Sequence, residues 1–285
     1  MALRTPTLRQ RRLGAELRRM REQAGFGGSQ LARLLGVTPA LVTQMENGKS
    51  SISPDRLREV ASACECHNQP LIDALIGIIE VQVKGWWENY RNQIPDFFLE
   101  SAEHEDFAAE TIRVFVSTFL PGLLQTDGYA RGIFSRRIPR LPAAELDLHT
   151  AFRLERRTRV LQSPEKKLEA YLHESSLLTR FGGPDVLREQ LHSLIDDSLR
   201  DDIRIRVIPF TAHTYPGPVE SAIYTVGEVS ELDTVEVESS RGPIFFDAPG
   251  ELESYREVFN RIDKAALSDE ESRDLIHRTA KNLKG

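Results

Sequence analysis

The sequence predicts an all-α head of short helices followed by a larger α+β domain with a mixed sheet. Three observations support this division. The chain has 285 residues, which is long for a single domain. Short apolar stripes at helical spacing, separated by glycines, occupy residues 1–68. From residue 94 onward, helical stripes alternate with strand-like runs, which is typical of an α+β domain.

Charge divides the chain at the same place. The net charge is -6, but residues 1–68 hold eleven Lys or Arg and six Asp or Glu, a net charge of +5. The remaining residues hold 26 basic and 37 acidic side chains, a net charge of -11. Because attraction to phosphate is decided locally, the basic head is compatible with a nucleic-acid partner.

The composition indicates a protein of the cytoplasm. Hydrophobic residues make up 40% of the chain and charged residues 28%, as in a globular protein with a core. Cys64 and Cys66 are too few for a disulfide framework, which favours a reducing compartment. The start, "MALRTPTLRQRR", lacks the apolar run of a signal peptide. The most apolar window, "ALIGIIEVQV", is interrupted by Glu80 and is too short to cross a bilayer.

Apolar stripes that end at glycines mark the first two helices of the head. The first stripe consists of Leu13, Leu17, Met20 and Ala24. Gly25, Gly27 and Gly28 end this helix. The second helix lies in "SQLARLLG" and ends at Gly36 after about two turns.

The third helix has clear start and stop signals. Thr38 is a preferred N-cap, and Pro39 suits the first helical position. Val42 and Met45 point inward at i, i+3, and Gly48 ends the helix.

A fourth helix starts at the cap formed by Ser53 and Pro54. Its inner face consists of Leu57, Val60, Ala61 and Cys64. Within this set of helices, the second and third are short and are joined by a three-residue turn with glycine. That pair is the helix-turn-helix arrangement.

The stretch "LARLLGVTPALVTQMENGK" resembles the helix-turn-helix of the XRE (Cro and phage-repressor-like) family. The resemblance implies a five-helix, lambda-repressor-like head with residues 38–46 in the major groove. The family usually has Ser or Thr, then Gln, where this chain has Gly27 and Gly28. A phosphate-contacting side chain is missing there, so backbone amides and arginines are expected to take over.

Side chains that point outward from the third helix are the predicted DNA contacts. Gln44 can pair bidentately with adenine, Thr43 can reach a base edge or a phosphate, and Ala40 can contact a thymine methyl. The full predicted set is Thr38, Ala40, Thr43, Gln44, Asn47, Lys49, Ser51, Arg11 and Arg12. The stretch "RTPTLRQRR" adds phosphate or minor-groove contacts in one interpretation, and is a disordered basic tail in the other.

A connecting helix is predicted over residues 69–93, between the head (1–68) and the second domain (94–285). Its apolar stripe has heptad spacing and consists of Ile72, Ile76, Ile79, Val83, Trp86 and Tyr90. One helix of about 23 residues would span ~35 Å. It either pairs with its twin in a homodimer, which suits half-sites ~34 Å apart, or packs on its own second domain. Gly77 and Gly85 weaken it as a continuous helix.

The second domain alternates between helices and strands. Helices are expected at 97–109, 122–136, 143–162, 183–199, 250–265 and 269–283. Strands are expected at 111–117, 168–173, 203–210, 221–227, 233–239 and 243–247, the last three as an antiparallel set. Ser268 and Glu271 form a capping box for the last helix.

Several phrases of this second domain resemble a domain of unknown function that follows XRE heads in actinobacterial regulators of the WhiJ type. The phrases are "FLPGLLQTDGYARGIF", "GGPDVLREQL", "IRVIPF" and "ALSDEESRDLI". Some members are antitoxin-like and occur beside a small partner protein. The resemblance implies that this domain binds such a partner, a small-molecule effector, or both.

Four side chains are candidates for effector or partner contacts. Tyr129 is either a core or a pocket residue, and packing is the simpler interpretation. Glu174 lies just past a strand. His213 and Tyr215 lie in "TAHTYPGP", a loop expected to cover a pocket, to offer a partner edge, or to be plain surface.

No metal, cofactor or catalytic site is expected. The cluster Cys64, Cys66 and His67 lacks the spacing and the second ligand pair of a zinc site. The "PEKK" at 164–167 resembles a nuclease element only faintly, and a solvated charge run is the better interpretation. The sequence therefore predicts a DNA-binding transcriptional regulator, not an enzyme. The alternative is an antitoxin-like protein that sequesters a small partner, with DNA binding only autoregulatory.

Overall fold

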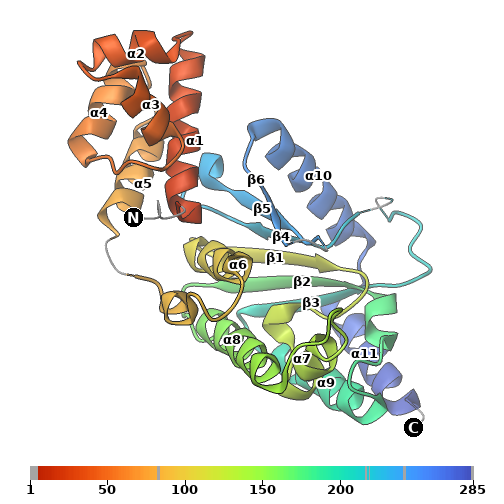
Figure 1. The fold of residues 1–285 in the computed structure, drawn as a ribbon. Helices are drawn as coiled ribbons and strands as arrows, with labels where there is room; N and C mark the ends of the chain where they lie inside the picture. Colours follow the sequence, from red (N-terminus) through yellow and green to blue (C-terminus); the bar gives the residue numbers. More distant parts are fainter. Residues whose placement is uncertain (1–5, 82–83, 216, 218, 240–241, 284–285) are drawn as a thin grey trace. The chain divides into compact units, whose positions relative to one another are not determined.

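The computed structural model describes residues 6–81, 84–215, 217, 219–239 and 242–283. The chain divides into two compact units, which are described separately here (Figure 1). The first comprises Met1–Trp86 and Glu228–Leu232. The second comprises Trp87–Gly227 and Asp233–Gly285. No helix among the described residues is long and apolar enough to cross a membrane.

The described residues of the first unit form five α-helices, as predicted for the head. They are α1 (Leu8–Gln23), α2 (Gly28–Leu34), α3 (Pro39–Glu46), α4 (Pro54–Ala63) and α5 (Gln69–Glu80). The predicted inner faces are confirmed, because Leu17, Leu31, Val42 and Leu57 are nearly inaccessible in a single core. Burial of these side chains is the main stabilising contribution to the unit.

The helix boundaries follow the predicted local signals. The Thr38 side chain accepts a hydrogen bond from the Leu41 amide at 3.2 Å, and Ser53 caps α4 in the same way. Gly36 and Gly48 follow their helices with φ of 64° and 66°, a left-handed conformation that glycine adopts without strain. The caps and glycines therefore set where α3 begins and ends.

The prediction of one continuous connecting helix is wrong. Helix α5 ends at Glu80, Val81 has an extended backbone, and Trp86–Tyr90 form a separate 3-10 helix, η1. Val83 lies outside the described residues. The apolar stripe is real but serves two cores, since Ile72 and Ile76 pack in the first unit whereas Tyr90 packs against Phe152 in the second. Helix α5 thus completes the head, and the predicted division after residue 68 falls inside the first unit.

A six-stranded mixed sheet organises the second unit, in the order β3-β2-β1-β4-β5-β6. The strands are β1 (Thr111–Val116), β2 (Lys167–His173), β3 (Ile203–Ile208), β4 (Ala222–Thr225), β5 (Thr234–Val237) and β6 (Ile244–Phe246). Strands β1, β2 and β3 are parallel, and β4, β5 and β6 join antiparallel, which confirms the predicted mixed sheet and antiparallel set.

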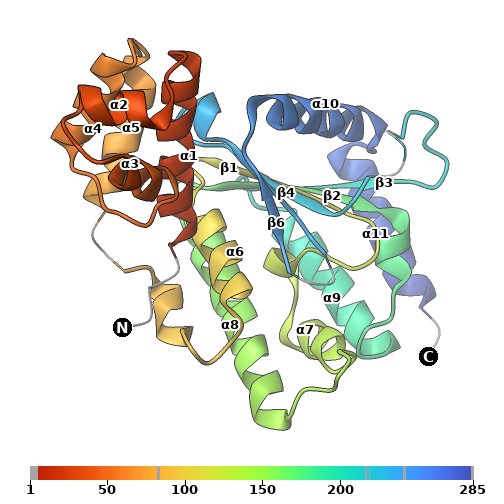
Figure 2. The ribbon, with the colours of Figure 1, turned by 45° about the horizontal axis from the view of Figure 1, so that its top comes forward.

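Helices cover both faces of this sheet (Figure 2). On one face lie α6 (Asp96–Phe107), α7 (Asp127–Phe134), α8 (Ala143–Leu161), α9 (Pro184–Asp197) and α11 (Asp269–Asn282). Helix α10 (Pro249–Ala265) lies on the other face. The capping box between Ser268 and Glu271 is present at the start of α11, as predicted.

Alternation along the strands builds two cores. Ile112 and Val114 of β1 point toward α9 and α11, whereas Phe115 points toward α10. The same period holds in β5, where Val235 and Val237 face α10. The residue between them, Glu236, therefore faces the opposite side, where α6 and α8 lie.

Candidate functional site

Exposed and mostly polar side chains on the outward side of α3 and next to its two ends form a set named here the recognition surface. It consists of Thr38, Ala40, Thr43, Gln44, Asn47, Lys49 and Ser51, all of them exposed. Val42 and Met45 on the opposite side of α3 are 1% and 5% exposed. The structure therefore brings together seven of the nine predicted contacts on one face.

Internal hydrogen bonds restrict some of these side chains but not others. The Thr43 hydroxyl donates to the Pro39 carbonyl, and the Asn47 amide donates to the Thr43 carbonyl. Across the described residues, the side chains of Gln44 and Lys49 make no hydrogen bond or ion pair. These two therefore keep their full capacity to bind a base edge and a phosphate.

A buried ion pair and a close backbone approach hold α3 against α1. Arg21 donates to both carboxylate oxygens of Glu46, from Nε at 2.5 Å and from Nη2 at 3.0 Å. A Cβ at Gly14 would lie 2.5 Å from the Glu46 carbonyl oxygen, so only glycine allows this crossing. This clamp was not predicted from the sequence. Its signal was Gly14 on the apolar side of the first helix, where alanine would be the better helix former.

The predicted role of Arg12 is wrong. Its side chain is buried, pairs with Glu16, and donates to the carbonyl of Glu231, which belongs to the same compact unit. Arg11 is half-buried and donates to the Pro6 carbonyl at 3.0 Å. The apolar stripe of α1 did not predict the burial of Arg12. Arg12 lies beside the stripe and is buried by polar contacts, which a pattern of apolar residues does not show. Arg9, Arg11 and Arg12 belong to α1, so the interpretation as a disordered tail is wrong for them, and Arg4 lies outside the described residues.

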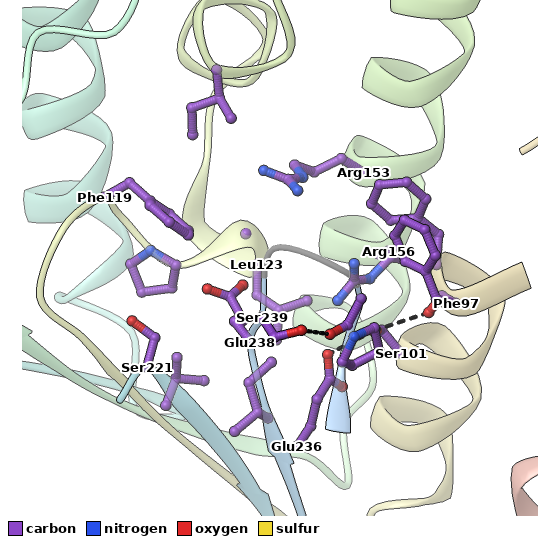
Figure 3. A pocket seen from close by; sticks show the side chains of 18 of the residues that line it. Phe97, Ser101, Phe119, Leu123, Arg153, Arg156, Ser221, Glu236, Glu238 and Ser239 are labelled. Carbon is purple, nitrogen blue, oxygen red and sulfur yellow. Dashed lines mark hydrogen bonds between the residues drawn. The ribbon is translucent and has the colours of Figure 1, made fainter. Parts of the chain in front are cut away.

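The second unit contains a cavity of about 590 Å³ between the sheet and helices α6, α7 and α8 (Figure 3). Its floor includes Val114, Ile223 and Glu236, from β1, β4 and β5. Aromatic and apolar side chains form much of the wall, namely Phe97, Phe98, Phe119, Leu123, Ile133 and Phe134. The size and the apolar lining with a few polar groups are typical of small-molecule sites.

Two of the charged groups in this cavity have partners. Arg156 of α8 forms a buried bidentate pair with Glu105 of α6. Glu236 accepts a hydrogen bond from the Ser101 hydroxyl at 2.6 Å and lies 3.0 Å from His104 Nδ1. Partners within the protein already bind these groups, so they shape the cavity more than they attract a ligand.

Arg153 and Glu238 have no such partner. Arg153 Nη1 donates to Gln125 at 2.6 Å, and its guanidinium lies 4.4 Å from the centre of the Phe134 ring. Its buried Nε has no acceptor among the described residues. Burial, together with the nearby Arg156, lowers the pKa of Arg153 to about 10. Glu238 is an exposed residue that lines the cavity, and desolvation of its carboxylate there, together with the nearby Glu236, raises its pKa to about 7.

Comparison with known families places this cavity in a recognised domain. A family model described as a domain of unknown function (DUF5753) matches residues 99–278, more than half of the chain. The chain belongs to the DUF5753 family. A second family model, described as a helix-turn-helix domain, matches residues 12–75 and indicates a DNA-binding regulator. No curated protein and no solved structure gives a significant match.

The four predicted effector residues do not line the cavity of the DUF5753 domain. Tyr129 is fully buried, and its hydroxyl accepts from the Leu120 amide at 3.3 Å, so it is a core residue. Glu174 accepts from the Phe210 amide at 2.8 Å. His213 is exposed, and Tyr215 packs against His173.

The charged cavity residues of the DUF5753 domain were not among the predicted site residues. A signal for them exists in "DTVEVES", where Glu236 and Glu238 alternate with valines. Both carboxylates therefore share the strand face opposite to the valine core. Acidic side chains on a face that helices cover are costly unless they are paired or functional.

The raised pKa of Glu238 predicts a pH-dependent stability. The folded state holds this proton more tightly than the unfolded chain, whose ordinary value is 4.5. The stabilising contribution is therefore complete below about pH 4.5 and is lost as the pH rises through about 7. Glu238→Gln should raise the melting temperature relative to wild type at about pH 8 and leave it nearly unchanged at about pH 4.5.

Glu257→Gln is the control for this measurement, because its expected change in stability has the opposite sign. Arg261 lowers the pKa of Glu257, so the carboxylate stabilises the folded state only above its ordinary pKa of 4.5. This variant should lose a little stability near neutral pH. A Glu238→Gln protein that melts below wild type at about pH 8 would contradict the assignment.

Proposed function

We propose that this protein is a sequence-specific transcriptional regulator that reads its operator with the recognition surface and binds a small-molecule effector in the DUF5753 cavity. The observation that carries the proposal is the pair Gln44, on the clamped helix α3, and Lys49, just after it, both exposed and with side chains that bind no described residue. A rigid helix with unpaired polar side chains loses little conformational entropy when it enters the major groove. The proposal includes no catalysis, so a turnover screen with magnesium, manganese and zinc should be flat.

A homodimer on a two-fold symmetric operator fits this proposal. One head offers few side chains able to read bases, so a single half-site would be recognised weakly. Two heads on half-sites one DNA turn apart, ~34 Å, would multiply the specificity. Sedimentation with and without operator DNA measures the stoichiometry, and one chain per full operator would contradict this part.

Substitutions on the recognition surface test the DNA-binding proposal. Gln44→Ala should cost ~1–3 kcal/mol on the cognate site and relax the preference at one base pair. Lys49→Ala should weaken all sequences alike and lower the slope of log affinity against log salt by about 1. Fluorescence anisotropy with promoter DNA at several salt concentrations measures both effects.

Two matched variants serve as controls for this experiment. Gln69→Ala and Lys84→Ala remove the same side-chain types at exposed positions of the first unit outside α3. Both should bind the operator like wild type. Unchanged affinity in the double variant Gln44→Ala and Lys49→Ala would reject the recognition surface.

An antitoxin-like role, with a small partner protein on the second domain, is the alternative. Leu178 and Phe210 support it, because they are 51% and 62% exposed and follow the neighbouring parallel strands β2 and β3. Exposed apolar side chains at one sheet edge suit a protein partner. Co-purification under native expression, lost in Leu178→Ser with Phe210→Ser, would favour this role. A partner-free wild-type preparation would count against it.

A further inference from the structure

Among the described residues, four charged side chains that line the DUF5753 cavity form no ion pair, namely Arg137, Arg153, Glu220 and Glu238. Arg156 is neutralised by Glu105, and Glu236 is bound by Ser101 and lies beside His104. Arg153 has no acidic partner, and Glu238 accepts no hydrogen bond from any described residue. Arg153 and Glu238 attract each other electrostatically but form no ion pair. A cavity with unpaired charges of both signs is complementary to a molecule that carries both.

Arg153 is held in place for an anionic group. Gln125 accepts from its Nη1, and Gln125 in turn donates to the Leu120 carbonyl at 2.6 Å. The guanidinium lies over the Phe134 ring and reaches from α8 into the cavity (Figure 3). Nη2 donates to no described residue, which leaves a donor for a carboxylate at the edge of a preorganised group.

Glu238 offers a site for a cationic group of the ligand. It follows β5 and lies on the same face as Glu236, whose negative charge disfavours a second carboxylate anion nearby. A protonated amine beside Glu238 would relieve this repulsion and supply the missing hydrogen-bond donors.

The remaining lining limits the ligand further. Four carboxylates lie in the wall, Glu105, Glu220, Glu236 and Glu238, against Arg137, Arg153 and the neutralised Arg156. A nucleotide or another polyanion would be repelled by this balance. A purely apolar molecule would displace water from the unpaired charges, Arg153 and Glu238 among them, and would compensate none of them. The aromatic wall nevertheless requires that the ligand has an apolar body.

We propose that the cavity binds a zwitterionic molecule, with an acid group at Arg153, an ammonium group at Glu238, and an apolar body against Phe97, Phe98 and Phe119. An amino-acid derivative or a short apolar peptide has this chemistry and suits a volume of about 590 Å³. This inference rests on the proposed effector role of the cavity and names the class of molecule that fills it.

Three forms of one dipeptide test the inference by calorimetry on the full-length protein. The probes are phenylalanyl-leucine, its N-acetyl form and its C-terminal amide. The free dipeptide should bind roughly 10-fold or more tightly than either blocked form, because each block removes one charge-assisted contact. ATP serves as the polyanion comparison and should bind more weakly than the free dipeptide.

Two variants test the contacts at the two ends of the ligand one at a time. Arg153→Met should bind the acid and the amide equally, while still preferring the amine over the acetyl form. Glu238→Gln should show the reverse pattern. A general loss of structure would weaken all three probes together and leave the preferences unchanged. Arg136→Met is the control, since Arg136 is exposed and does not line the cavity.

The outcomes distinguish this inference from the proposed function. Equal binding of all three probes, tighter binding of ATP, or no dipeptide binding at about 10 mM would overturn the zwitterion class. If the dye anilinonaphthalene sulfonate still enters the cavity in that case, an effector of another class remains the proposal. If neither dye nor any probe binds, the effector role falls as well. Operator binding by α3 is measured separately and depends on neither result.

Discussion

Alanine at position 14 is expected to destabilise the helix-turn-helix domain by about 1–3 kcal/mol and to abolish measurable operator binding. The added Cβ would lie 2.5 Å from the Glu46 carbonyl oxygen and 2.8 Å from that of Met45. Both atoms are backbone, so α1 and α3 must move apart to admit a methyl group. That movement would also stretch the Arg21–Glu46 ion pair, which holds α3 against α1.

Gly77→Ala is the matched control for this prediction. Gly77 is also helical, on the exposed side of α5, and an added Cβ there meets no atom within 4 Å. This variant should gain about 0.5–1 kcal/mol from helix propensity alone. Hydrogen exchange of α1 and α3 amides, together with anisotropy on operator DNA, measures both variants. A Gly14→Ala protein with unchanged protection and affinity would disprove the close crossing.

Loss of the carboxylate in Glu105→Gln is expected to destabilise the DUF5753 domain by about 3–5 kcal/mol. Glu105 is 1% exposed, and Arg156 opposite it is 7% exposed. The variant leaves the guanidinium buried without a counter-charge, which costs far more than an exposed ion pair contributes. Thermal and denaturant unfolding at neutral pH measure the change.

A second substitution should rescue much of this loss. Adding Arg156→Met removes the buried charge, so the double variant should be more stable than Glu105→Gln alone. The exposed pair of Glu257 and Arg261 provides the comparison, and Glu257→Gln should change stability only slightly. Equal losses in the buried and the exposed pair would show that Glu105 and Arg156 are not buried together in solution.

Most secondary structure followed from local patterns in the sequence. Thr38 and Gly48 bracket α3 because a hydroxyl cap and a left-handed glycine act within one turn of the chain. The alternation in "IRIRVIPF" placed β3 because a strand faces two environments with a period of two. Gln44 was predicted to point outward by the same logic, since Val42 and Met45 had to point inward.

The errors share one cause, which is that a pattern shows a face but not what covers it. The stripe of α5 was predicted to continue to Tyr90, yet its first part packs in the head and Tyr90 packs against Phe152. Arg12 looked available for phosphate because its partner Glu231 lies 219 positions away. Tyr129 could have faced a pocket or a core, and only the packing of the DUF5753 domain decided for the core.

The sequence by itself determined the helix-turn-helix head, the recognition surface and the order of the strands, because periodicity, caps and glycines act over a few residues. Only the tertiary structure decided the cavity and its charges. Ser101 meets Glu236 across 135 positions, and Glu105 meets Arg156 across 51. Pairings at such separations depend on how the sheet and helices pack, so no local pattern could show that Arg153 and Glu238 stay unpaired.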